Sequence, residues 1–125
     1  MLCIDTSSLI AYLDGSRGPD VELVDQAFSD QVGVLCPVTV TEILSVPGLD
    51  GQVREQILRL PTLPITDGFW ERAGLLRAKV LRLRHRARLA DTLIAQACLD
   101  HRASLVARDR DFRAFARVAG LKLAP

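Results

Sequence analysis

The chain has 125 residues, of which 49% are hydrophobic, and a formal net charge of +1 at pH 7. This length predicts one domain spanning residues 1–125, and no second domain needs to be invoked for these residues. The near-zero charge excludes attraction to nucleic acid by net charge alone, so any such binding has to come from local patches.

The first half of the chain predicts strands alternating with helices. "MLCI" predicts a short strand, which is followed by Asp5, a hydroxyl-rich turn and a helix over "LIAYL". Apolar residues three and four apart predict a helix over 20–30, and the run "VGVLCPV" predicts a buried strand. Short helices are predicted over "TVTEILS" and over 52–60, and "PTLPI" is an extended connector or a brief strand.

The second half continues this alternation after one ambiguous segment. Leu81 to Arg84 alternate like a strand, but a longer apolar stripe beginning at Phe69 favours a helix that ends near Arg84. A basic loop to Leu89 follows. After Asp91, "TLIAQACLDH" predicts a helix, "ASLVA" a strand, "DFRAFARVA" a last helix and "LKL" a terminal strand. Strands separated by helices indicate an α/β fold with three layers, α/β/α, and a mainly parallel central sheet.

The cysteines and the N-terminus indicate a cellular compartment. Cys3, Cys36 and Cys98 are odd in number, widely spaced and set among apolar residues, which predicts buried thiols in a reducing compartment. The N-terminus lacks the basic segment of a signal peptide, and no apolar run reaches the length of a membrane span. We therefore expect a cytoplasmic protein with no membrane partner.

Four acids follow predicted strands or begin predicted helices: Asp5, Glu42, Asp91 and Asp109. Each could cap a helix, and Thr39 to Glu42 fits a capping box. Ligands of parallel α/β sheets bind beyond the carboxyl ends of the strands, so we expect all four acids at one sheet edge. Repulsion among them calls for a cation, and an all-oxygen ligand set favours Mg²⁺ or Mn²⁺. Because Mg²⁺ completes its shell with phosphate, we expect a substrate that carries phosphate.

Three segments carry a family resemblance: "CIDTSSLIAYL", "VTVTEIL" and "LADTLIAQACLDHRASLVARDRDF". In this order they resemble the PIN-domain nucleases and, at this length, the VapC-type toxins of bacterial toxin–antitoxin pairs. The resemblance covers nearly the whole chain. It implies a PIN-like fold, a metal-dependent endoribonuclease that acts on structured RNA such as tRNA, an inhibiting antitoxin as partner, and a homodimer.

The resemblance also implies catalytic and metal-binding roles for four acids: Asp5, Glu42, Asp91 and Asp109. Thr6 matches the family's hydroxyl beside the first acid, and Asp111 is an auxiliary fifth acid. For Asp111 the alternative is a cap or an ion pair at the start of the last helix. Where the family often has Thr or Ser two residues before the fourth acid, this chain has Ala107, so one hydroxyl is missing.

A basic segment precedes Asp91. From Arg77, six Lys or Arg residues and His85 pass before that acid. Arginines near a metal site give affinity for phosphate without reading sequence, and four are candidates for binding RNA: Arg82, Arg84, Arg86 and Arg88. The alternative is a solvated helix end whose cations favour the negative end of the helix dipole.

The expected chemistry is hydrolysis of RNA by water that carboxylate-held metal ions activate, leaving a 5′-phosphate and a 3′-hydroxyl. A receiver-like signalling module would also bind Mg²⁺, but it needs two acids after the first strand, where "CIDTSS" has one. A catalytically silent RNA-binding or partner-binding domain is a further alternative. A nucleophilic thiol would require Cys36 or Cys98 to meet His85 or His101 in the fold.

Overall fold

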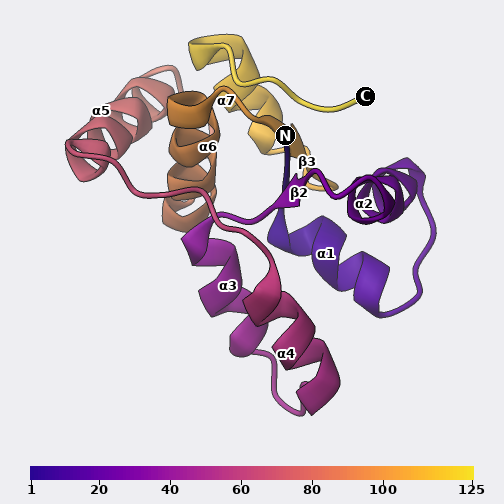
Figure 1. Cartoon of the computed structure of the whole chain (residues 1–125). Coiled ribbons are helices and arrows are strands. Elements are labelled where there is room, and N and C mark those ends of the chain that lie inside the picture. Colours follow the sequence, from indigo (N-terminus) through magenta and orange to yellow (C-terminus); the bar gives the residue numbers. More distant parts are fainter.

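The computed structural model describes residues 1–125 and contains three strands and seven helices (Figure 1). The strands are β1 (Leu2–Ile4), β2 (Gly33–Val34) and β3 (Ser104–Val106). The helices are α1 (Thr6–Leu13), α2 (Pro19–Ser29), α3 (Pro37–Leu44), α4 (Gly51–Arg59), α5 (Phe69–Arg82), α6 (Leu89–His101) and α7 (Phe112–Ala119). The predicted alternation of strands and helices is confirmed.

The strands form a parallel sheet in the order β2-β1-β3. Leu2 of the central strand lies opposite Gly33 on one side and opposite Ser104 on the other. Two single parallel bridges widen the sheet at its edges: Leu35 with Thr62, and Leu105 with Leu123. The segments "PTLPI" and "LKL" therefore each contribute one bridging residue at the edges of the sheet.

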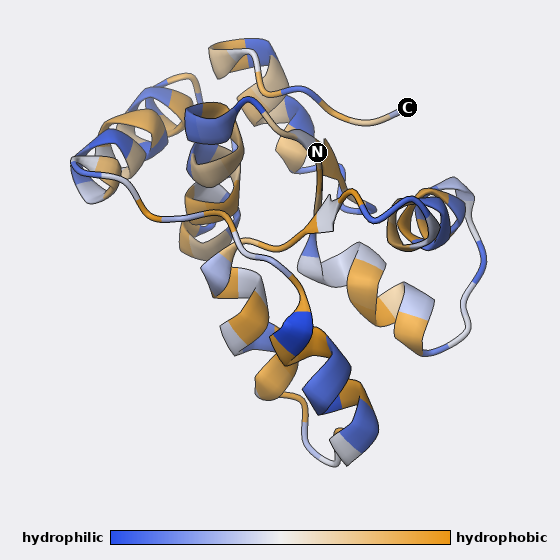
Figure 2. Cartoon of the chain, viewed as in Figure 1, coloured by the Kyte–Doolittle hydropathy of each residue, from blue (hydrophilic) through white to orange (hydrophobic).

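Helices cover both faces of the sheet, which gives the three layers expected from the sequence. Successive strand side chains point to opposite faces, so Cys3 and Leu105 pack with α5, α6 and α7, whereas Ile4 and Val106 pack with α1 to α4. Full burial of a side chain such as Ile4 stabilises the fold by roughly 1.5–3 kcal/mol. Figure 1 shows α3 and α4 extending beyond the carboxyl ends of the strands. In Figure 2, α6 is largely hydrophobic, as expected for a helix between α5 and the sheet.

Two helices in the first half begin earlier than the sequence predicts. α1 starts at Thr6, so the hydroxyl cluster that we expected to form a turn is its first turn. α3 starts at Pro37, because a proline has no N–H to leave unpaired at the first helical position. The strand predicted over "VGVLCPV" is therefore too long, and β2 ends at Val34.

The helix expected after Asp91 also begins earlier, at Leu89. Arg88 occupies its N-cap, which places Asp91 inside the first turn. Cys36 is likewise the N-cap of α3, so Glu42 lies in the helix interior. The capping explanations for Glu42 and Asp91 are therefore wrong, because neither residue occupies the N-cap position of its helix.

The ambiguous segment after Phe69 is a helix, as the apolar stripe indicated. Its buried residues are Phe69, Ala73, Leu76 and Val80. The helix ends at Arg82, two residues before the predicted end, and Arg84 adopts a left-handed conformation with a φ of 62°. The three cysteines are free and buried, as predicted. None of the helices combines the length and the apolar character that crossing a membrane requires.

Candidate metal and nucleic-acid site

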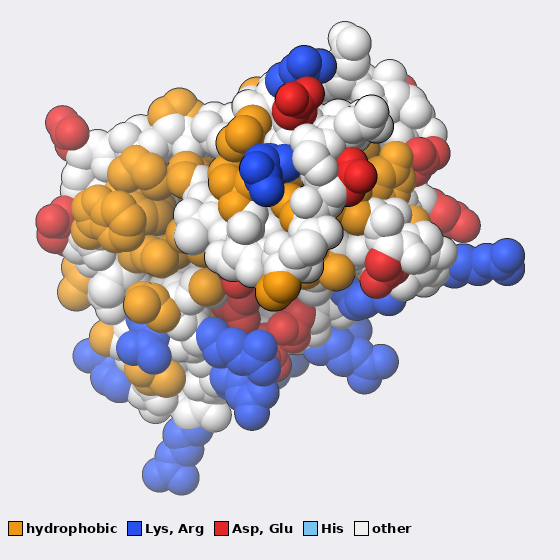
Figure 3. All heavy atoms as spheres, turned by 90° about the horizontal axis from the view of Figure 1, so that it is seen from below, with side chains coloured by type: hydrophobic (Ala, Val, Ile, Leu, Met, Phe, Trp, Pro, Cys, Tyr) orange, Lys and Arg blue, Asp and Glu red, His pale blue; other side chains and the backbone are white.

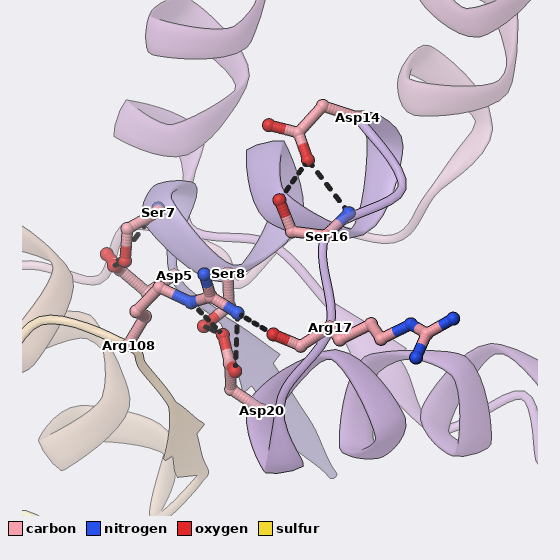
Figure 4. Close-up of polar contacts among 8 residues, drawn as sticks. All are labelled: Asp5, Ser7, Ser8, Asp14, Ser16, Arg17, Asp20 and Arg108. Atoms are coloured by element: carbon pink, nitrogen blue, oxygen red, sulfur yellow. Dashed lines mark hydrogen bonds and ion pairs between the residues drawn. The ribbon is translucent and has the colours of Figure 1, made fainter.

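Asp5 lies directly after the central strand, at the carboxyl edge of the sheet. It is the N-cap of α1, and its Oδ2 accepts hydrogen bonds from the backbone N–H and the hydroxyl of Ser7 (Figure 4). The residue is only 3% exposed. Burial raises the pKa of Asp5, the Ser7 hydrogen bonds oppose this, and the charge of Glu42 adds to it. Asp5 is therefore a helix cap and, at the same time, a buried acid facing other acids.

Thr6 holds Glu42 in place. The Thr6 hydroxyl donates a 2.7 Å hydrogen bond to Oε1 of Glu42 and lies 3.2 Å from the hydroxyl of buried Thr39. The bond joins the first turn of α1 to α3, two helices that begin at the same sheet edge. Because the charge of Glu42 contributes to the raised pKa of Asp5, the two carboxylates belong to one region.

Three further acids form a tight group beside them. One carboxylate oxygen each of Asp91, Asp109 and Asp111 lies within 4.8 Å of the other two. Asp91 comes from α6, whereas Asp109 and Asp111 follow β3. Oδ1 of Asp109 accepts a 2.9 Å hydrogen bond from the backbone N–H of Asp111, which fixes the turn that carries both acids.

The charge on Asp91 links the two groups of acids. Burial, followed by the charges of Asp5 and then Asp109, raises the pKa of Asp91 to about 6, while Arg88 opposes the shift. Such a shift is expected where carboxylates share a site with no cation among them. The structure thus brings all five acids singled out from the sequence to one edge of the sheet.

Two buried oxygens in this region have no hydrogen-bond partner: Oδ2 of Asp91 and Oδ2 of Asp111. Buried polar atoms are nearly always paired, so unpaired carboxylate oxygens indicate a missing ligand. A set of carboxylate oxygens with no thiol or imidazole suits a hard divalent cation. The residues present therefore fit a divalent metal ion, which Asp91, Asp109 and Asp111 would hold.

Two of the four candidate arginines reach the acids. Arg86 and Arg88 lie 3.7 and 3.9 Å from Oδ2 of Asp111, distances that are too long for hydrogen bonds. Between them Ala87 is buried, and its carbonyl accepts a 2.8 Å hydrogen bond from Nε of Arg77. This anchor fixes the loop and turns its two flanking arginines towards the site.

The other two candidates, Arg82 and Arg84, are exposed and form no ion pair. Arg82 is in the last turn of α5, where the helix-dipole explanation applies. Three arginines that the sequence analysis missed lie near the site instead: Arg110, Arg113 and Arg117. Arg113 and Arg117 are four residues apart in α7 and lie on one helix face, but nothing in the sequence placed that face beside the acids.

The loop that carries Asp109 is anchored through its neighbour Arg108 (Figure 4). The Arg108 guanidinium donates to both carboxylate oxygens of Asp20, at 3.0 and 3.1 Å, and to the Arg17 carbonyl at 2.8 Å. Buried Ser8 donates a 2.9 Å hydrogen bond to the same carboxylate. Asp20 therefore ties α1, α2 and the loop together, and the hydrogen bond from Arg108 is the main reason that its pKa is lowered.

The thiols cannot act as nucleophiles. Cys36 and Cys98 are fully buried, and burial raises the pKa of Cys36 to about 12. The attacking species would be a thiolate, which these surroundings disfavour and hide from solvent. One ring nitrogen of His101 lies 2.7 Å from the Pro64 carbonyl. Water is therefore the available nucleophile at the acidic edge.

Comparison with family models matches residues 2–119 to the PIN domain. Among curated proteins, the chain is 30% identical to Ribonuclease VapC11 of Mycobacterium tuberculosis, and the alignment covers 99% of this chain and 98% of that protein. This alignment includes the segments that contribute acids to the sheet edge.

Two solved structures illustrate the structural likeness. FitAcB from Neisseria gonorrhoeae aligns with a TM-score of 0.71 and 17% identity, over 100% of this chain and 97% of that chain. VapBC-5 of Mycobacterium tuberculosis, described as a member of the VapBC family of toxin-antitoxin systems, aligns with a TM-score of 0.62 and 20% identity, over 97% and 94% of the chains. At these identities the likeness concerns the fold, and the predicted three-layer fold is confirmed.

Proposed function

The chain belongs to the PIN-domain family, and we propose that it is a metal-dependent endoribonuclease, the toxin of a type II toxin–antitoxin pair. One observation carries the proposal: five acids meet at one sheet edge, and two of their buried oxygens have no hydrogen-bond partner. The relative VapC11 is named a ribonuclease, which supports RNA as the substrate. Family membership rules out the receiver-like alternative.

The proposed metal ligands are Asp91, Asp109 and Asp111, with Asp5 and Glu42 beside them. Mg²⁺ or Mn²⁺ bound there would acidify a water molecule and neutralise charge on the phosphoryl and leaving oxygens. Ser7 fixes the Asp5 carboxylate and Thr6 fixes the Glu42 carboxylate, so both would be held in defined orientations beside a bound metal ion. Attack on the phosphodiester leaves a 5′-phosphate and a 3′-hydroxyl, and no covalent intermediate with the protein is needed.

The basic loop would bring the substrate to these acids. Arg86 and Arg88 lie beside Asp111 and are mostly exposed, so they can contact phosphate oxygens of an RNA strand. Such contacts orient the backbone without selecting a sequence. The family resemblance implies structured RNA such as tRNA as the target. The low content of aromatic residues, 5%, favours recognition of shape and backbone over stacking on unpaired bases.

The test is cleavage of cellular RNA by the purified protein with Mg²⁺ or Mn²⁺. We expect cleavage that EDTA abolishes and that Asp5→Asn or Asp91→Asn lowers by at least about 100-fold. Asp67→Asn, which removes one exposed charge elsewhere, is the matched control. Sequencing the new 5′ ends identifies the target. If no cellular RNA is cut in either metal, the protein is a silent binding domain.

An antitoxin is the proposed protein partner, as in the VapBC relative. A mostly apolar groove of about 250 Å³ between α1, α2 and α4 supports a protein partner, and its lining includes Tyr12, Leu13 and Ile57. Coexpression with the small reading frame expected upstream should yield a complex that Leu13→Glu weakens. An uncomplexed protein in that experiment would contradict the toxin role.

A homodimer in the cytoplasm completes the proposal. Trp70 and Leu75 of α5 are 61% and 71% exposed, which leaves apolar surface for a second copy. The buried free thiols are consistent with a reducing compartment. The mass of the protein in solution, measured by light scattering, tests the dimer.

A further inference from the structure

Four of the seven residues that line a pocket beside the acidic site are arginines. It has a volume of about 230 Å³ and lies between the loop before α6 and the start of α7. Its polar lining consists of His85, Arg86, Arg110, Asp111, Arg113 and Arg117. Ala114 is the one hydrophobic residue in the lining. The pocket thus offers positive charge and hydrogen-bond donors from four arginine side chains.

The positive charges in this pocket are largely unpaired. Arg110, Arg113 and Arg117 form no ion pair with any acid. The single acid in the lining, Asp111, also belongs to the proposed metal site, so a bound cation would neutralise it. Like charges on one helix face destabilise the helix. A bound anion would relieve this repulsion, which makes an anionic ligand the natural occupant.

We propose that this pocket binds a backbone phosphate of the RNA substrate next to the scissile phosphodiester, an inference that rests on the proposed function. Asp111 lines the pocket and also lies in the acid group with Asp91 and Asp109. An RNA strand whose scissile phosphate sits at the acids therefore carries a neighbouring phosphate into the pocket. Figure 3 shows this arrangement on the surface, where Lys and Arg side chains flank a recess that contains acidic side chains.

Phosphate fits this pocket better than a base does. The arginine fork matches phosphate oxygens in two parallel hydrogen bonds. The volume is below the roughly 300 Å³ at which pockets for larger organic ligands begin, and the lining contains no Phe, Tyr or Trp side chain on which a base could stack. The RNA path therefore runs from the acids over α7, and not over Arg82 and Arg84.

The experiment compares two doubly substituted proteins that lose the same charge. Arg113→Gln with Arg117→Gln removes two arginines from the pocket, and Arg54→Gln with Arg59→Gln removes two exposed arginines from α4. RNA cleavage with Mg²⁺ gives KM and kcat. Fluorescence anisotropy of a labelled single-stranded oligouridine in EDTA gives an affinity that does not require cleavage, measured over a range of KCl concentrations.

For the pocket variant we expect KM and the oligouridine Kd to rise about tenfold, with kcat within about twofold of the wild type. The slope of log K against log salt should fall by about 0.7 for each lost phosphate contact. The α4 variant should match the wild type. Oligoglutamate of equal charge should compete with oligouridine at least about tenfold more weakly than unlabelled oligouridine does.

Three results separate the possible failures. If the wild type cleaves RNA but the pocket variant keeps its KM and its salt slope, the phosphate pocket is overturned and the ribonuclease proposal stands. If the wild type cleaves no RNA, and the pocket variant still binds oligouridine more weakly than the wild type does, the pocket is supported and the ribonuclease proposal fails. If oligoglutamate competes as well as oligouridine, the pocket belongs to an acidic protein segment and the RNA assignment is overturned.

Discussion

Asp91 is a residue at which stability and function conflict. Burial and the neighbouring acids oppose its ionisation, and Oδ2 has no hydrogen-bond partner. Its folded pKa of about 6 lies above the unfolded value of about 3.9. The contribution of Asp91 to stability is therefore complete below pH 3.9 and is lost as the pH rises through 6. Without metal, the ionised carboxylate destabilises the folded protein at neutral pH.

The substitution Asp91→Asn should therefore stabilise the protein while it abolishes cleavage. In EDTA we expect the melting temperature to rise by a few degrees at pH 7.5 and by much less at pH 5, where the wild-type residue is already protonated. Thermal unfolding at the two pH values is the measurement. Asp67→Asn controls for the loss of an exposed charge and should leave the melting temperature unchanged at both pH values. An unchanged or lower melting temperature for Asp91→Asn at pH 7.5 would contradict the inference that the ionised Asp91 carboxylate is repelled by the neighbouring acids.

A second residue-scale prediction concerns Thr6, whose hydroxyl orients Glu42. Partners of this kind typically contribute 10- to 100-fold to metal affinity or activity. We expect Thr6→Ala to raise the Kd for Mn²⁺ by roughly tenfold, and Thr6→Ser to restore it because the donor returns. Isothermal titration of both variants with Mn²⁺ is the measurement. Equal affinity of Thr6→Ala and the wild type would show that the hydroxyl does not orient the site.

At the scale of elements, the turn after β3 depends on a contact with α2. Arg108 precedes Asp109 in the chain and binds Asp20, which also accepts a hydrogen bond from Ser8 of α1. Two acids of the proposed metal site are carried by this turn. The contact therefore fixes the position of one side of the site relative to the start of α1, although none of the three side chains forms a hydrogen bond with the acids of the site.

Asp20→Asn should loosen this turn, and the loss should depend on pH. Because Arg108 lowers the folded pKa of Asp20, the ionised carboxylate contributes stability above the unfolded pKa of about 3.9. That contribution is lost as the pH falls through the lower folded value. We expect the variant to melt a few degrees lower at pH 7 and to approach the wild type in acid, below about pH 3.9. Thermal unfolding at both pH values measures this.

Glu22→Gln is the control for that prediction, because Glu22 is in the same first turn of α2 and makes no ion pair. It separates loss of the contact from loss of a favourable charge at a helix start. If Asp20→Asn and Glu22→Gln change stability equally at pH 7, the contact with Arg108 does not anchor the turn.

The sequence predicted the presence of the helices and strands better than the residues at which they begin and end. Apolar runs and helical stripes located all seven helices and three strands, because burial on two sides of a sheet leaves a strong pattern. The ends depend on local detail: Pro37 starts α3 inside a run that reads as strand, and Arg88 caps α6 before Asp91.

The acids were predictable and the α7 arginines were not. Asp5 and Asp109 follow strands and Asp91 lies in the first turn of α6, so the topology brings these three to one edge, whereas Glu42 lies inside α3 and is joined to that edge by the Thr6 hydroxyl. Arg113 and Arg117 reach the site only because α7 packs beside the loop that carries Arg86, and nothing near them in the sequence announces that contact. Arg82 and Arg84 form no ion pair with the acids, and their role in binding RNA stays a prediction.

At the scale of the whole molecule, a metal ion would join parts of the chain that repel one another without it. The acids come from β1, α3, α6 and the turn before α7. A ligand that binds only the folded state stabilises it by about 2.7 kcal/mol at 100 times its Kd. We expect Mn²⁺ to raise the wild-type melting temperature by several degrees, with little effect on Asp91→Asn. Differential scanning fluorimetry with NaCl at matched ionic strength tests this, and an equal shift in both proteins would contradict a shared metal site.

The order of the sheet has a consequence during synthesis. β1 comes from residues 2–4 and occupies the centre, but its neighbour β3 comes from residues 104–106 of a 125-residue chain. Pairing over such a separation forms late, because a long loop has to close first. While the last residues remain inside the ribosome, Asp5 has no Asp109 to meet. A nascent chain therefore carries no assembled acidic site until the segment from β3 to Asp111 has left the ribosome.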